Sequence, residues 1–215
     1  MPGLYRTPQE KRELESRNGV LQFYAVLHYI ESWKDGESKI TPKLILELQY
    51  RAIAGIYTCA GKFRDGPVKV LDAGQVVHEP PPSEEIAGLV DEMCRYVNEN
   101  WSTGPAIHLA SYLMWRLNWI HPFFGGNGRT ARSVSYLALC AKLGMRLPGK
   151  ITIPDHIVAR RGAYIRALRS SDAAWKSNRL DLSQMESLME SVMAAQLVEL
   201  MEEARGKEAS RKNPM

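Results

Sequence analysis

The sequence lacks several features that define whole classes of protein. Its three cysteines, Cys59, Cys94 and Cys140, are far apart and odd in number, so they predict neither a disulfide framework nor a zinc cluster. No stretch of 18 apolar residues occurs, which argues against a membrane span and a membrane partner. The first residues also lack the apolar segment of a signal peptide. We therefore expect a cytoplasmic protein.

Carboxylates are missing from one long stretch of the chain. The whole sequence has 28 Lys and Arg against 24 Asp and Glu, a net charge of +4 that is too mild to indicate a nucleic-acid partner. No Asp or Glu occurs between Asn100 and Pro154, whereas six cations do. Either these cations pair with acids elsewhere in the fold, or the stretch forms a positive region that attracts an anionic ligand.

The remaining pattern is mostly helical. Capping boxes begin at Thr7 and Ser183, each with Glu three residues later, and Pro122 must end the helix before it. We expect the first helix to loosen near Asn18-Gly19, where a turn-forming residue precedes a glycine. Helices are expected over residues 8–33, 83–98, 102–120 (beginning between 102 and 105) and 127–144. Three further helices are expected to begin at residues 42, 155 and 183.

Residues 60–82 interrupt the helical pattern with glycines, prolines and short β-prone pieces. Val68–Val70 and Gln75–His78 predict a small hairpin with a turn of three or four residues. A single hairpin is marginally stable, so we expect it to lean on the helices.

A glycine-rich loop at His121–Arg132 carries the clearest chemical signal. Three glycines before a helix can turn backbone N–H groups toward an anion, and the helix dipole favours negative charge there. Arg129 and Arg132 lie three residues apart, on one helical face. The ordinary pKa of a histidine, about 6.5, suits His121 to act as a general base at neutral pH. The alternative is structural: a tight connection, arginines that cap carbonyls and a core histidine.

These twelve residues resemble the signature loop of Fic-domain proteins, His-Pro-Phe-x-(Asp or Glu)-Gly-Asn-Gly-Arg-x-x-Arg, and differ from it at one position. The hairpin and the helix leading into the loop follow the layout of the same family. The resemblance implies an all-α fold, a Fic-like helical bundle with a small β-hairpin flap. It divides the chain into an N-terminal helical segment (1–44), a Fic-like core (45–180), a C-terminal helix packing on the core (181–206) and a disordered tail (207–215).

The resemblance also implies a protein adenylyltransferase, which moves AMP from ATP to a Ser, Thr or Tyr hydroxyl of a target protein. His121 would act as the general base, Arg129 would neutralise the β-phosphate and Arg132 would hold the terminal phosphate. The anion hole would be formed by Gly126, Asn127 and Gly128. The hairpin would align an extended segment of the target by edge pairing. Its expected contact residues are Lys62, Val68, Val70, Val76 and His78.

The one departure from the signature is Gly125, where the family has the carboxylate that holds Mg²⁺. Three interpretations stay open: a distant acid supplies the ligand, the phosphate compound needs no protein-held metal, or the site binds without turnover. The alternative to AMP transfer is thus a non-catalytic or different-donor relative. The family's self-inhibiting string is not found, although Glu15 pairing with Arg132 is one hypothesis. An inhibitory partner or self-association is a further expectation of the resemblance.

Overall fold

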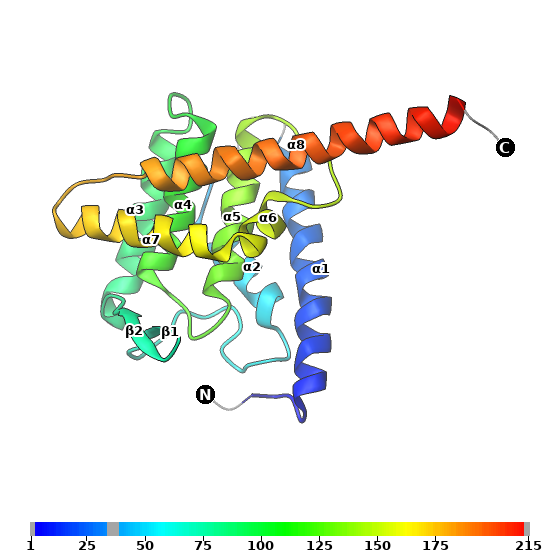
Figure 1. The fold of residues 1–215 in the computed structure, drawn as a ribbon. Coiled ribbons are helices and arrows are strands. Elements are labelled where there is room, and N and C mark those ends of the chain that lie inside the picture. Colours follow the sequence, from blue (N-terminus) through cyan, green and yellow to red (C-terminus); the bar gives the residue numbers. More distant parts are fainter. Residues whose placement is uncertain (1–2, 34–38, 213–215) are drawn as a thin grey trace. The chain divides into compact units, whose positions relative to one another are not determined.

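The computed structural model describes residues 3–33 and 39–212, and the chain divides into two compact units after Met145. This division falls inside the segment 45–180 that was expected as one core. The first unit contains α1 (Pro8–Ser32), α2 (Pro42–Ile53), β1 (Val70–Asp72), β2 (Gln75–His78), the short helix η2 (Ser83–Glu85), α3 (Ile86–Glu99), α4 (Ala106–Ile120) and α5 (Asn127–Lys142). The predicted mostly helical fold with a small hairpin is confirmed (Figure 1).

The core of the first unit is built around α4 and α5, which pack side by side (Figure 1). Their approach is close because small side chains face each other, and the Ser135 hydroxyl donates a 2.7 Å hydrogen bond to the Ala110 carbonyl. Helices α1 and α2 pack against α5, and α3 packs against α4. His121 ends α4 in the left-handed conformation, immediately before Pro122. The rigid α4–α5 pair therefore holds both ends of the glycine-rich loop.

Helix α1 is continuous over 25 residues, so the expected loosening at Asn18-Gly19 is wrong. Asn18 is buried, and its Nδ2 donates to the Ala54 carbonyl at 2.8 Å, beyond the end of α2. Gln22, one turn further along, donates in the same way to the Leu48 carbonyl at 2.9 Å. Tertiary hydrogen bonds thus hold the helix together where its local sequence favours a break.

The hairpin is present, but its turn is shorter than expected. Strand β1 is Val70–Asp72 rather than Val68–Val70, and Asp72 pairs with Gln75 across a two-residue loop. The loop residues Ala73 and Gly74 have φ angles of 47° and 82°, as a type I′ turn requires. The sequence concealed this turn because alanine is unusual at a positive φ.

The second unit consists of α6 (Ile153–Ala159), α7 (Arg161–Lys176) and α8 (Ser183–Lys212). Gln196 of α8 is fully buried and organises the entry to α6. Its Oε1 accepts the Ile153 N–H at 2.8 Å, and its Nε2 donates to the Pro148 carbonyl at 2.7 Å. Thr152 caps α6, and Asp155 returns a bond to the Thr152 N–H, which completes a capping box.

Helix α8 continues through Lys212, into the segment 207–215 for which a disordered tail was expected. Residues 213–215 lie outside the described ranges. The end of α8 is rich in Glu, Ala, Arg and Lys, which are strong helix formers even without packing. No helix in the described ranges combines the length and the hydropathy of a membrane span.

Two neighbouring substitutions in α1 should have opposite effects on stability. Asn18→Ala removes the hydrogen bond to the half-buried Ala54 carbonyl beyond α2 and should lower the free energy of unfolding by about 1–3 kcal/mol. Gly19→Ala adds a Cβ with nothing within 4 Å. Because alanine loses less conformational entropy than glycine in a helix, this change should raise the free energy of unfolding by about 0.5–1 kcal/mol. Urea unfolding of the two variants measures both changes, and equal effects of the two would contradict the role given to Asn18.

Candidate functional site

The loop between α4 and α5 ends in a glycine that no other residue could replace without movement. Gly126 caps α5 with φ 81°, and a Cβ added there would lie 2.9 Å from Ile53 Cγ2. The first hydrogen bond of α5 runs from the Thr130 N–H to the Gly126 carbonyl at 2.9 Å. The N–H groups of Asn127, Gly128 and Arg129 therefore precede the helical ladder, and such groups are available to an anion.

Asn127 fixes this loop with its side chain. Its Oδ1 accepts the Phe123 N–H at 3.0 Å, and its Nδ2 donates to the Phe123 carbonyl at 2.7 Å. Phe123 itself is fully buried, with its ring centroid 5.8 Å from that of Phe63. Because the Asn127 amide is committed to the loop, its part in an anion hole falls to its backbone N–H.

His121 stands at the start of the loop in an unusual backbone conformation, with φ 49°. Its Nδ1 lies 3.3 Å from the Asn118 carbonyl, which can only accept, so Nδ1 carries the proton and Nε2 keeps a lone pair. Burial lowers the pKa of His121 to about 4, against the opposing effect of the Asn118 hydrogen bond. The nearby charges of His78 and Arg64 lower that pKa further. The expected ordinary pKa of His121 is therefore wrong, and the imidazole is neutral at pH 7, with a lone pair that can accept a proton.

Arg64 is the residue that positions His121, and the sequence analysis missed it. Its side chain is almost fully buried and donates only to backbone carbonyls. The acceptors are His121 at 2.8 Å, Gly66 at 2.9 Å, Pro81 at 2.5 Å and Ile120 at 3.5 Å. Burial lowers its pKa from the ordinary value of 12.5. An arginine in a glycine-rich connection carries no local signal of this role.

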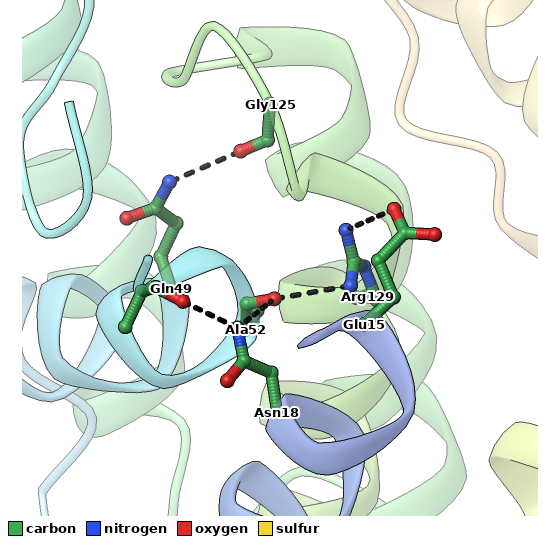
Figure 2. Close-up of polar contacts among 7 residues, drawn as sticks. Glu15, Asn18, Gln49, Ala52, Gly125 and Arg129 are labelled. Atoms are coloured by element: carbon green, nitrogen blue, oxygen red, sulfur yellow. Dashed lines mark hydrogen bonds and ion pairs between the residues drawn. The ribbon is translucent and has the colours of Figure 1, made fainter. Parts of the chain in front are cut away.

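Gln49 of α2 holds the same loop from the other side, and it too was missed. It is fully buried, and its Nε2 donates to the Gly125 carbonyl at 3.0 Å (Figure 2). Its Oε1 accepts the Gly61 N–H at 2.6 Å. One amide thus joins the glycine-rich loop to the segment that leads into the hairpin. A buried glutamine within the apolar pattern of α2 was the available signal.

The two signature arginines have different surroundings. Arg129 donates from Nη1 to the Ala52 carbonyl at 3.0 Å, and its Nη2 lies 3.4 Å from Glu15 Oε1 (Figure 2). Arg132 lies over the start of α5, since a Cβ added at Gly128 would be 3.2 Å from Arg132 Nη1. The hypothesis that Glu15 pairs with Arg132 is therefore wrong, because α1 passes beside Arg129 instead.

The hairpin is tied to the base of the loop through His78. His78 Nε2 lies 2.7 Å from the carbonyl of Trp119, which is two residues before His121 at the end of α4. Three of the five expected flap residues, Val70, Val76 and His78, lie on the strands, whereas Lys62 and Val68 precede them. The exposed apolar side chains of the hairpin are Leu71, Val76 and Val77.

The donor set at position 125 does not fit a protein-held metal. Mg²⁺ prefers carboxylate oxygen, and Gly125 has no side chain. Glu15 is brought to the site but is paired with Arg129. Within residues 3–33 and 39–212, no group of three His, Cys, Asp or Glu residues is placed to hold a metal ion.

The low pKa of His121 makes a prediction about stability. Its folded-state pKa of about 4 lies below its unfolded value of about 6.5, so neutral His121 favours the fold at higher pH. This contribution is complete above pH ~6.5 and is lost as the pH falls toward 4. The melting temperature of His121→Gln should therefore fall less than that of the wild type between pH 7.5 and 5. His28→Gln, an exposed control, should follow the wild type; equal falls in all three would contradict burial of His121.

Comparisons with known proteins agree with this geometry. Residues 39–139 match the Fic/DOC family. The chain is 32% identical over 129 residues to the protein adenylyltransferase Fic of Drosophila persimilis, covering 59% of this chain and 24% of that protein. The corresponding protein of Drosophila melanogaster is also 32% identical, with 25% covered. The chain thus spans about a quarter of the length of the curated relatives it matches.

Two solved structures have the same fold. A Fic domain containing signaling protein from Bacteroides thetaiotaomicron has a TM-score of 0.69 and 20% identity, with 92% of this chain and 73% of that chain covered. Fic-1 from C. elegans has a TM-score of 0.65 and 20% identity, with 88% of this chain and 52% of that chain covered. Residues 39–139 thus match the Fic/DOC family, and the chain shares its fold with the two solved Fic proteins.

Proposed function

We propose that the Fic/DOC domain of this chain transfers AMP from ATP to a hydroxyl side chain of a target protein. The observation that carries the proposal is a neutral His121, with Nε2 free to accept a proton, on the loop that leads into the N-terminus of α5. Arg129 and Arg132 add positive charge at that helix end. The names of the curated relatives, protein adenylyltransferase Fic, support the same reaction.

In the proposed reaction, His121 Nε2 takes the proton from a Ser, Thr or Tyr hydroxyl of the target. The hydroxyl oxygen then forms a bond to the α-phosphorus of ATP, and the bond from that phosphorus to the α,β-bridging oxygen breaks. Pyrophosphate leaves with the electron pair of the broken bond. The backbone N–H groups of Asn127, Gly128 and Arg129 stabilise the phosphate charge, as preorganised donors do in other transfer reactions.

The hairpin is the proposed docking edge for the target. It is a two-stranded sheet, so within the described residues each strand has one edge without a partner strand. An extended segment of the target would pair with such an edge, and Leu71, Val76 and Val77 would contact its side chains. Because His78 joins β2 to the Trp119 carbonyl, a target segment held on the hairpin would lie near the base at His121 in space.

A second candidate function is phosphate binding without transfer, or with a different donor. Two observations favour it: Gly125 offers no metal ligand, and Arg129 is occupied by Glu15 and the Ala52 carbonyl. Such a protein would keep the hairpin and the anion site but release no pyrophosphate.

Glu15 should compete with phosphate for Arg129. The pair is partly exposed, with side chains 28% and 37% accessible, so it contributes about 1 kcal/mol at most. Glu15→Gln should therefore tighten pyrophosphate binding by up to roughly fivefold in isothermal titration calorimetry. Glu13→Gln, on the exposed side of α1, is the matched control and should change the affinity less. Weaker binding by Glu15→Gln would contradict competition at Arg129.

AMP transfer is tested with ATP that carries a label in either the α- or the γ-phosphate, incubated with the protein and a mixture of candidate targets. We expect the α-label, and not the γ-label, to become attached to protein. His121→Ala should reduce the rate by about 10²–10⁴-fold, as loss of a general base does, whereas His28→Ala should retain it. Pyrophosphate binding without any attached α-label would exclude AMP transfer to the targets offered and favour the second candidate.

A further inference from the structure

The space beside Gly125 is occupied by an aromatic ring that no signature residue accounts for. A Cβ added at Gly125 would lie 3.5 Å from Tyr57 Cε2 and 3.6 Å from Tyr57 Cδ2, in ordinary contact. Tyr57 is fixed there by the N-terminal segment: Gly3 forms a β-bridge with it, and the Leu4 N–H donates to the Ile56 carbonyl at 2.9 Å. The ring edge of Tyr57 would thus contact the carboxylate that the Fic family has at this position.

The ammonium group of Lys11 lies over the same ring. Its Nζ is 5.9 Å from the Tyr57 ring centroid and 5.5 Å from that of Tyr5. A hydrogen bond with Tyr57 is the largest of the interactions that raise the pKa of Lys11, and the charge of Glu15 adds to them. Lys11 therefore carries a full positive charge at neutral pH, and it contacts the same ring that lies beside Gly125.

We propose that Lys11 takes the place of a protein-held metal, so that this site binds a polyphosphate group with cations of its own side chains alone. The proposal deepens the phosphate site assigned above and rests on it. Lys11 supplies the charge beside position 125, and Arg129 and Arg132 supply it at the start of α5. Tyr57 is the positioning residue that holds the lysine.

The charge count at position 125 supports the exchange. A carboxylate with a bound Mg²⁺ adds one net positive charge, the sum of one negative and two positive charges. Gly125 with Lys11 also adds one positive charge. The net positive charge beside position 125 is thus the same without a divalent ion, and it is available to the negative charge of a polyphosphate. Lysine suits this purpose because its compact ammonium group binds phosphate as a point charge.

In the described part of the chain, Glu15 is the carboxylate whose charge acts on Lys11. The chain from Asn100 to Pro154 has no carboxylate, so α5 and its loop contribute none. Glu15 lies one turn after Lys11 on α1, but it is shared with Arg129 at 3.4 Å. Asp65, on the segment that Arg64 joins to the loop, is exposed and is the acid to test as a rival metal ligand.

The test is pyrophosphate binding by isothermal titration calorimetry, in EDTA and in Mg²⁺. For the wild type we expect dissociation constants within about threefold of each other in the two conditions, after correction for pyrophosphate held by free Mg²⁺. Lys11→Gln should weaken binding in EDTA by roughly tenfold, as expected for loss of one partly solvated charge. Arg12→Gln is the control, because it removes one positive charge from the next residue of α1. Arg12 donates to the exposed Gln9, so its loss should change binding less than twofold.

Three results would overturn the proposal. Binding that needs Mg²⁺ and is lost in Asp65→Asn would assign the metal to that carboxylate, while leaving the proposed phosphate site intact. Equal weakening by Lys11→Gln and Arg12→Gln would reduce the effect of Lys11 to general surface charge. Absence of binding in both conditions would contradict the phosphate site itself, and with it the proposed function.

Gly125→Asp provides a converse test in a position that can accept a side chain. The residue has an ordinary φ, and its Cβ would make only van der Waals contact with Tyr57. The new carboxylate should pair with Lys11 and weaken pyrophosphate binding in EDTA by roughly tenfold. Mg²⁺ should restore the lost affinity in this variant. Unchanged binding in EDTA would show that position 125 and Lys11 do not act on the same ligand.

Discussion

A single buried guanidinium group fixes the place where the proposed chemistry occurs. Arg64 donates to the carbonyls of Ile120 and His121 at the end of α4, and to those of Gly66 and Pro81 on either side of the hairpin. A charge taken out of water is tolerated only when its hydrogen bonds are satisfied, and here backbone dipoles satisfy them. The left-handed conformation of His121 and the position of the hairpin depend on this one cluster.

Around that cluster the site is a set of backbone positions held by side chains from distant helices. Gln49 holds the Gly125 carbonyl, and Asn127 closes the loop on Phe123. These amides hold the loop, and the N–H groups at the start of α5 precede the helical ladder. In the proposed anion site, the loop is thus fixed by hydrogen bonds from side chains before a ligand binds.

The sequence predicted local features well and distant contacts poorly. Three local features were predicted because prolines, glycines and caps act on adjacent residues. They are the loop from His121 to the start of α5, the end of α4 before Pro122, and strand Gln75–His78. Asn18 was misread because its partner at Ala54 is 36 positions away. Arg64 and Gln49 went unnoticed for the same reason. A polar side chain has the same local appearance whether it faces water or a buried carbonyl.

The Ala52 carbonyl accepts hydrogen bonds from two side chains, Arg129 at 3.0 Å and Asn18 at 3.5 Å (Figure 2). If Arg129 turns toward a ligand, this oxygen keeps the amide of Asn18 as a donor. No buried acceptor is then abandoned, which is the usual penalty for breaking an internal hydrogen bond. Moving Arg129 to a ligand therefore costs the loss of its weak ion pair with Glu15 and no unsatisfied carbonyl. The contacts of Arg129 in the unliganded protein hold its side chain in one position, yet they allow it to move to a ligand at low cost.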